Sequence, residues 1–356
     1  MINARSLCNK LNVLNILLLT CEFDLIFVTE TWLYSDITDS LLLCNSAYTL
    51  IRKDRPDNFG GVAVFVKHGL KIEYIDLLPC FQRLECIIFD VLFSSVQYRF
   101  ICIYNPPSMA NDITHISCLC SCLDSYCISK MQVVVVGDFN YPHIDWSVPV
   151  NNGSICSSLF LTCVLENGLT QLVNSPTRGN HCIDLVMVSD VNILFDISVV
   201  DPFVISCDHS CVEFTIVCPC HHTANSILYC RDFKAADYTS MISFLMDVNW
   251  QMLDQSCSVD VYWDVLSMKL NECIEKFVPL RRVVLFSKPQ CLKHIRKLLL
   301  LKKKWFHKNR VKYKKIAKEY ELAVKSFYDY RESYVINSND LSKLYSYVNM
   351  KLCHTL

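Results

Sequence analysis

The sequence has few glycines, few charged residues and no long hydrophobic run. Only seven of its 356 residues are glycine, and charged residues make up 19% of the chain. A disordered protein combines low hydrophobicity with a high net charge, whereas here hydrophobic residues make up 52% and the formal net charge is −1. The composition therefore indicates a globular protein, long enough for one large domain and an appendage.

Charged residues interrupt the long apolar stretches. Leu298–Leu301, for example, lies between Lys297 and Lys302. A membrane-spanning helix needs roughly 20 apolar residues, and no stretch approaches that length. Met1 is also not followed by the charged segment and apolar core of a signal peptide. We therefore expect a soluble, intracellular protein with no membrane partner.

The 22 cysteines lack the spacing of a disulfide framework or a zinc site. They lie in apolar runs such as Leu84–Ile88, and no secretory signal accompanies them. The clusters Cys118–Cys122 and Cys218–His222 contain no paired Cys-x-x-Cys knuckle at zinc-finger spacing. We predict that most of the cysteines are reduced core residues.

The near-neutral total conceals two oppositely charged parts. Residues 281–356 carry 19 Lys and Arg against five Asp and Glu, and residues 1–280 carry 15 against 30. All seven glycines lie between Gly60 and Gly179, which places the tight turns in the first part of the chain. The second part is predicted to be mostly helical.

The basic excess is concentrated in Lys293–Lys318, which has 12 basic residues, no acidic one, and the aromatic residues Trp305, Phe306 and Tyr313. Such a segment can follow a phosphate backbone and offer faces for base stacking. The alternative is a solvated basic helix that only keeps the protein soluble. Apolar residues then recur at helical spacing up to Tyr328, which predicts an amphipathic helix that packs on another element.

Short apolar segments with turn residues between them predict a mixed α/β fold. We expect helices over 7–18 (capped by Ser6), 111–129 and 154–167, and strands over 25–28, 62–66, 86–93, 99–104, 133–136, 183–188, 197–200 and 212–217. Strand meanders mixed with helical crossings predict two packed β-sheets flanked by helices, in a domain that closes near Val217.

Polar side chains follow several of these strands where each one ends. Phosphodiester hydrolysis needs a hard cation, a base that orients water, and a donor to the phosphate oxygens. Glu30 can supply a metal carboxylate, Asp138 the base and His209 the donor, while Asp184 can orient the imidazole. Each residue alone is weak evidence, because Gly-Asp turns and Asp-His pairs occur in many non-catalytic proteins.

Taken together and in this order, the motifs resemble the endonuclease/exonuclease/phosphatase family, and within it the endonuclease domains of non-LTR (LINE-type) retrotransposons. The matching segments are Asn3–Leu7, Thr29–Leu33, Gly60–Ala63, Tyr104–Pro107, Gly137–Asn140, Ile183–Val186 and Ser206–Ser210. Gly137–Trp146 and Asn174–Arg178 look more like the retroelement branch than the repair or lipid-phosphatase branches.

The resemblance implies a four-layer, DNase I-like α/β sandwich and a role for each polar residue. Mg²⁺, or Mn²⁺ in its place, would be held by Glu30 with help from Asn3 and Asp208. The residues implied in catalysis are Asp138, which would position the attacking water, Asn140 and Tyr104 at the scissile phosphate, and His209 backed by Asp184. The implied partner is DNA. From its position in a loop between strands, the Pro176–His181 segment is a candidate for DNA contact.

The same resemblance divides the chain into an endonuclease-type domain over 1–217, a linker region with helices over 218–280, and a basic helical segment over 281–356. In such polyproteins this segment precedes a reverse transcriptase, and no polymerase motif follows it here. It could also contact the element RNA. An enzyme that nicks chromosomal DNA would act in the nucleus.

One departure from the family concerns the start of the domain. Family members carry a strand that leads into the Asn of Asn3–Leu7, whereas only Met1 and Ile2 precede Asn3 here. We therefore expect a gap in a sheet and a poorly held Asn3.

Three functions remain open: a metal-dependent DNA endonuclease, a repair-type enzyme or lipid or inositol phosphatase of the same fold, and an inactive retroelement fragment that binds nucleic acid.

Overall fold

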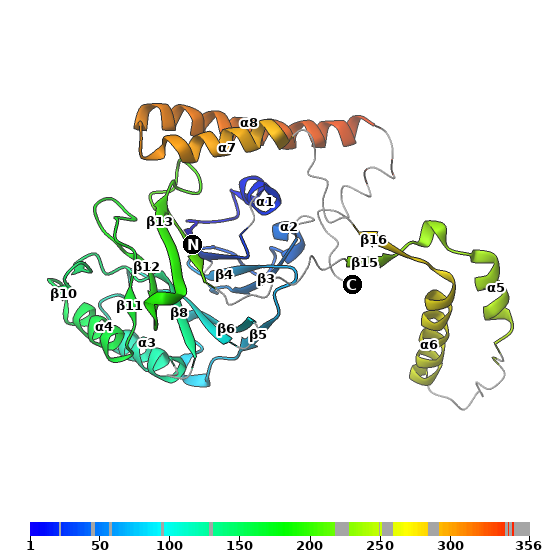
Figure 1. Cartoon of the computed structure of the whole chain (residues 1–356), viewed down its shortest axis with the longest axis horizontal. Helices are drawn as coiled ribbons and strands as arrows, with labels where there is room; N and C mark the ends of the chain where they lie inside the picture. Colours follow the sequence, from blue (N-terminus) through cyan, green and yellow to red (C-terminus); the bar gives the residue numbers. More distant parts are fainter. Residues whose placement is uncertain are drawn as a thin grey trace. The chain divides into compact units, whose positions relative to one another are not determined.

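The chain forms two compact units in a computed structural model (Figure 1). Met1–His221 and Lys288–Leu356 make up the first unit, and His222–Ser287 the second. The structure describes residues 1–20, 23–43, 47–56, 59–93, 96–127, 131–217, 228–248, 250, 259–283, 292–338, 341 and 344. None of the helices in these ranges is long and apolar enough to cross a membrane.

The first sheet has four strands in the order β1-β2-β4-β3. They are β1 (Ile2–Asn3), β2 (Leu25–Thr29), β4 (Val62–Lys67) and β3 (Tyr48–Lys53). β1 runs parallel to β2, and the other neighbouring strands are antiparallel. α1 (Leu11–Thr20) and α2 (Asp39–Leu43) cover its outer face, where apolar side chains of both helices join those of β2 and β4 in one core cluster.

The second sheet has six strands in the order β11-β12-β8-β7-β6-β5. They are β11 (Thr170–Gln171), β12 (Asp184–Val188), β8 (Gln132–Asp138), β7 (Val96–Tyr104), β6 (Glu85–Phe93) and β5 (Ile72–Ile75). β7 and β8 are parallel and lie close together at Gly137, where a Cβ would be 1.9 Å from the carbonyl oxygen of Ile103. Only glycine fits this approach.

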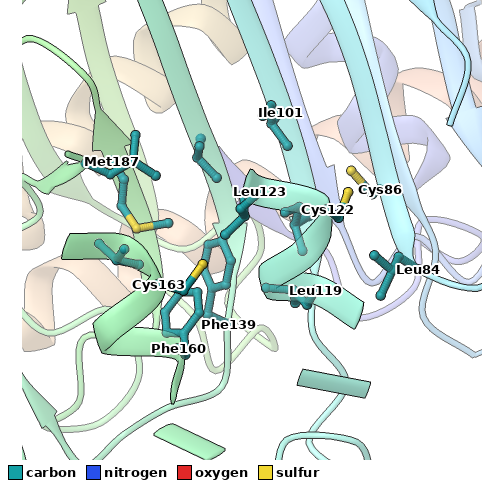
Figure 2. Close-up of a cluster of buried hydrophobic side chains, with 14 of the residues drawn as sticks. Leu84, Cys86, Ile101, Leu119, Cys122, Leu123, Phe139, Phe160, Cys163 and Met187 are labelled. Atoms are coloured by element: carbon teal, nitrogen blue, oxygen red, sulfur yellow. The ribbon is translucent and has the colours of Figure 1, made fainter. Parts of the chain in front are cut away.

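The two sheets pack face to face through a core that contains Phe27, Phe89 and Phe100. On the outer face of the second sheet lie α3 (Ile113–Tyr126) and α4 (Ile155–Glu166), with Phe160 of α4 stacked on Phe139 (Figure 2). The predicted architecture of two packed sheets flanked by helices is therefore confirmed.

Smaller elements complete this part of the unit. They are η1 (Pro79–Phe81), β9 (Ile144–Asp145), β10 (Val150–Asn151), η2 (Val191–Ile193) and the hairpin of β13 (Leu194–Val200) and β14 (Cys211–Ile216). Fourteen described cysteines are free thiols, and several, such as Cys122 and Cys163, lie in the core shown in Figure 2. The Cys218–His222 cluster lies outside the described residues.

β1 corrects the expectation for Asn3. Asn3 pairs with Thr29 of β2 and is buried, so it is held firmly. The amine and carbonyl groups of Met1 form hydrogen bonds with the backbone of Val212, which ties β1 to β14. A cavity of about 710 Å³ lies beside this contact and is lined by residues of β2 and β14 together with side chains of α1, α7 and α8.

The first helix also begins later than predicted. α1 starts at Leu11, and Ser6 is not its cap, because Arg5 and Ser6 lie outside the helix with positive φ angles of 40° and 77°. Their backbone instead follows β2, with hydrogen bonds from the Ser6 and Leu7 amides to the carbonyls of Glu30 and Thr31. Tertiary pairing therefore overrides the helical pattern of the first residues.

The basic helices belong to the first unit. α7 (Leu292–Phe306) and α8 (Arg310–Asn337) lie side by side, joined by a short turn (Figure 1). Their apolar stripes pack together and onto Ile16 of α1, with Leu298 and Tyr320 among the buried side chains. The division expected at residue 281 thus differs from the compact units, because this stripe is covered by the domain itself.

The second unit is small and is described by itself. β15 (Leu228–Arg231) and β16 (Leu280–Val283) form an antiparallel pair. Between them in sequence lie η3 (Phe233–Ala235), α5 (Tyr238–Met246) and α6 (Val259–Phe277), and the rings of Phe244 and Phe277 pack against each other.

Candidate metal and phosphate site

Strand register brings the predicted polar residues to one edge of the packed sheets. Tyr104 and Asp184 each pair with Asp138, from the two neighbours of β8. Glu30 follows β2 directly and belongs to the other sheet. One ligand atom each of Glu30, Asp138 and His209 lies within 4.8 Å of the other two, a spacing at which one metal ion could be bound.

The Asn3 amide joins the two sheets at this point. Its Nδ2 donates to Glu30 Oε1 at 2.9 Å and to Asp138 Oδ2 at 2.8 Å. Its Oδ1 accepts from the Arg5 amide at 3.2 Å. All the hydrogen-bonding capacity of the NH₂ group is used, so Asn3 fixes the distance between the two carboxylates.

His209 lies against two carboxylates in the interior. Its Nδ1 is 2.8 Å from Asp184 Oδ2 and 3.9 Å from Asp138 Oδ2. Burial lowers the pKa of the imidazole, but the hydrogen bond to Asp184 and the negative charges of Asp184 and Asp138 outweigh it and raise the pKa above its usual value. The geometry therefore favours the imidazolium form.

Asp138 is the most deeply buried acid of the site, with no exposed surface. Burial and then the charge of Asp184 raise the pKa of its carboxyl well above the usual value, although His209 opposes this. Burial also raises the pKa of Tyr104, helped by the charges of Glu30 and Asp138. Negative charge at this edge is therefore costly unless a proton or a cation compensates it.

Asn140 is held in the turn that follows β8. Its backbone N–H donates to Asp138 Oδ1 at 3.1 Å, and its side-chain Nδ2 donates to the backbone carbonyl of Asn105 at 2.9 Å. Asn105, which is fully buried, in turn donates to the carbonyl of Phe139 at 2.7 Å and lies 3.1 Å from His115 Nε2. Sequence reasoning placed Asn105 in a motif but missed this clamp.

The structure does not bring Asp208 into the Glu30, Asp138 and His209 cluster. Its carboxylate pairs with Arg178 at 2.8 Å and lies 4.0 Å from Arg5. Thr177, beside Arg178, accepts hydrogen bonds at Oγ1 from the amides of Ile183 and Asp184. The 176–181 segment therefore supports the strand end that carries Asp184.

Glu85 is a second group that sequence reasoning missed. It lies at the start of β6, is buried, accepts from the Gly61 amide and pairs with Arg55 at 3.1 Å. A lone carboxylate in the apolar run Leu84–Ile88 was the signal that could have found it. Its contacts fix the Gly60–Gly61 turn, where the amides of Thr31 and Trp32 donate to the glycine carbonyls.

Backbone strain gathers at the same edge. Among the described residues, positive φ angles outside glycine occur at Arg5, Ser6, Glu30, Trp32 and Asn140. Such conformations cost about 1–3 kcal/mol each and persist where the surroundings impose them. Glu30 and Asn140 are therefore held in orientations that their own backbone preference would not give.

The donor set suits a hard divalent cation. Three carboxylates, Glu30, Asp138 and Asp184, meet a single imidazole, and Asp184 Oδ1 is buried with no hydrogen-bond partner. Oxygen ligands of this kind are those that Mg²⁺ and Mn²⁺ prefer. A cation here would offset the excess negative charge that burial makes costly.

Comparison with known proteins agrees with the motifs. Residues 98–213 match the family model described as endonuclease-reverse transcriptase. This segment contains Tyr104, Asp138, Asn140, Asp184 and His209. No curated protein matches the chain.

Several solved structures are similar in fold. A 3′-5′ exonuclease from Neisseria meningitidis is 20% identical, with 60% of this chain and 97% of that chain covered and a TM-score of 0.47. An AP endonuclease from Archaeoglobus fulgidus is 13% identical, with 60% of this chain and 97% of that chain covered and a TM-score of 0.47. The endonuclease domain of TRAS1, a telomere-specific non-LTR retrotransposon, is 13% identical, with 58% of this chain and 92% of that chain covered and a TM-score of 0.44. The match of residues 98–213 to the endonuclease-reverse transcriptase family model, which includes most of the site residues, confirms the resemblance predicted from the motifs.

Proposed function

We propose that this protein is a divalent-metal-dependent endonuclease of the retrotransposon type, which nicks DNA. The observation that carries the proposal is the convergence of Glu30, Asp138 and His209, with ligand atoms within 4.8 Å. Asp138 and His209 lie in the segment 98–213, which matches the endonuclease-reverse transcriptase family model. On chromosomal DNA, such an enzyme would work in the nucleus.

Each side chain has a chemical role in this proposal. Glu30 and Asp138 would hold Mg²⁺ or Mn²⁺ beside Asn3, and the ion would neutralise charge that develops on the phosphate. Asp138 can orient a water molecule and accept its proton at a carboxylate oxygen. Tyr104 and Asn140 lie beside Asp138 and would donate to the phosphate.

His209 suits phosphate binding better than metal binding. Metal ligation requires a neutral imidazole, whereas the carboxylates around His209 raise its pKa. With Nδ1 committed to Asp184, Nε2 is the nitrogen left to donate to a phosphate oxygen. Asp208 is placed to orient Arg178, which would contact the DNA backbone outside the buried site.

The basic helices favour a nucleic acid as substrate. Most basic residues of Lys293–Lys318 are exposed on α7 and α8, whereas Lys302 and Lys303 pair with acids of the domain. Two aromatic residues are less available for stacking than the sequence suggested, because Tyr313 is buried and Lys312 Nζ lies 3.7 Å from the Trp305 ring centroid. We propose backbone contact, with DNA and with element RNA, as the main role of this surface.

Nicking of supercoiled plasmid in the presence of Mg²⁺ tests the proposal. We expect the wild type to convert plasmid to the open circle, chelation of the metal to stop it, and Asp138→Ala and His209→Ala to abolish it. Asp190→Asn is a matched control. Asp184 of the site begins β12, whereas Asp190 lies just beyond the other end of this strand, where it caps η2. Equal nicking by wild type and Asp138→Ala would refute the assignment.

Substrate choice needs a separate comparison, because one fold supports several phosphodiesterase and phosphatase activities. Intact duplex, duplex with an abasic site and inositol phosphates should be assayed side by side. Preference for intact duplex supports the retrotransposon type, and preference for the abasic duplex supports a repair-type enzyme. DNA binding without any turnover would identify an inactive nucleic-acid binder.

A further inference from the structure

The loop that carries Asp208 and His209 is held from a distant part of the chain. Residues 201–210 connect β13 to β14, and Phe203, Val204 and Cys207 of this loop are buried. Within the loop, the Cys207 amide donates to the Val204 carbonyl at 3.0 Å. The next residues, Asp208 and His209, form the ion pairs of the site.

Lys302 of α7 fixes the first residues of this loop. Its side chain is 2% exposed, and its Nζ is 2.7 Å from Asp201 Oδ2. It also donates to the carbonyls of Pro202 at 2.9 Å and Phe203 at 3.3 Å. An ammonium group has three N–H donors, so the three acceptors use all of them and fix three consecutive residues of the loop.

α8 holds the same loop two residues further on. The Ile205 amide donates to Glu321 Oε1 at 2.7 Å. On the opposite side, the Cys207 thiol donates to the carbonyl of Ala4 at 3.5 Å, next to Asn3. The loop is therefore clamped between the α7–α8 pair and the segment that positions the candidate metal carboxylates.

We propose that Lys302 is a positioning residue for the site, and that α7 and α8 complete the active-site architecture rather than only linking domains. By fixing Asp201–Phe203, Lys302 sets the path of the loop and with it the position of His209 against Asp184. The role in catalysis rests on the proposed endonuclease function. The role in ordering the loop does not depend on it.

The neighbouring residue provides a control on the same helix. Lys303 pairs with Glu213 of β14, and the two side chains are 33% and 31% exposed, whereas the Lys302 side chain is buried. An exposed pair of this kind contributes little, whereas a buried charge that loses its partner is costly. Lys302→Met and Lys303→Met therefore separate positioning from general docking of α7.

The experiment measures plasmid nicking and amide hydrogen exchange on the full chain, at a temperature where every variant is folded. For Lys302→Met we expect kcat to fall about tenfold or more with little change in KM, because small displacements of catalytic groups lower the rate steeply. Exchange at the Ile205 and Cys207 amides should rise. Lys303→Met should stay within about twofold of the wild type, as expected for an exposed pair.

Two further variants keep the proposal open to refutation if Lys302→Met does not fold. Glu321→Ala removes only the acceptor of the Ile205 amide, and Lys302→Met with Asp201→Leu replaces the buried pair by apolar side chains. We expect Glu321→Ala to raise exchange at Ile205 and lower kcat.

Unchanged exchange and kcat in the folded variants would overturn the proposal. If the wild type does not nick DNA, the endonuclease assignment fails while the exchange data still decide whether the helices order the loop.

Discussion

Two groups of buried charge lie on the six-stranded sheet, and they are built in opposite ways. Asp90 of β6 and Arg99 of β7 face each other, with Arg99 Nε and Nη2 donating to the two carboxylate oxygens at 2.8 and 2.7 Å. At the other end of β7, Asp138 and Asp184 meet the single imidazole of His209, with Glu30 beside them.

The difference is one of charge balance rather than burial. Asp90 and Arg99 neutralise each other, and Gln97 gives Asp90 a further hydrogen bond at 3.0 Å. At the site, acids outnumber bases and Asp184 Oδ1 has no partner. A balanced pair can serve the architecture alone, whereas an unbalanced group indicates a position that a cation or substrate must complete.

Asp138→Asn should remove activity and leave the fold intact. We expect nicking to fall by roughly 10²–10⁴-fold, the usual contribution of a general base. Without metal, the thermal midpoint should stay the same or rise, because a buried charge that opposes Asp184 is lost. Plasmid assays and calorimetry measure the two effects. A variant that is both active and less stable would contradict the comparison.

Arg99→Met should have the opposite profile. It leaves the Asp90 carboxylate buried without its partner, so we expect the free energy of unfolding to fall by about 3–5 kcal/mol. Denaturant unfolding measures this loss, and folded protein should still nick DNA. The double variant Arg99→Met with Asp90→Leu should recover most of the stability. Failure to recover it would mean that the pair does more than balance charge.

Added Mg²⁺ should stabilise the wild type, because an ion that binds only the folded state raises its stability. At a concentration of 100 times its dissociation constant, the gain is about 2.7 kcal/mol. Calorimetry with and without the metal measures the shift. Asp138→Asn should lose most of it, and the Asp90 and Arg99 double variant should keep it. An equal shift in all three proteins would place the ion elsewhere.

Asp184→Asn should move the pH dependence. The raised pKa of His209 means that its imidazolium form adds stability below the unfolded value near 6.5, and this is lost as pH rises through the higher folded value. Without the Asp184 charge, the folded pKa should fall, so the alkaline limb of the nicking profile should move to lower pH. Rate profiles of both proteins measure it. An unmoved limb would show that another group controls it.

Sequence patterns predicted the parts of the site that depend on strands. Apolar runs that end in Glu30 and Asp138 identify β2 and β8, and the pleat places Asp184 opposite Asp138. Alternation and turn residues are local signals, so they can be found in one sequence. The two-sheet architecture follows from the order of these strands.

Contacts between distant segments could not be predicted in this way. Lys302 meets Asp201 across about one hundred residues of sequence, and nothing in the basic run distinguishes it from Lys303. The clamp of Asn105 and His115 and the positive φ of Glu30 arise only when the sheets pack. The apolar stripe of α8 predicted that something covers it, but not that α1 does.

Gly137 sets a limit on how this domain could diverge or be redesigned. A methyl group there would collide with the Ile103 carbonyl, one residue before Tyr104 and one residue before Asp138 on the two strands. Any larger residue must therefore push apart the two strands that carry these side chains. The position has no chemistry of its own, yet only a residue without a Cβ fits it with the two strands in place. In a related sequence, a larger residue at this position would mark a chain in which β7 and β8 lie further apart.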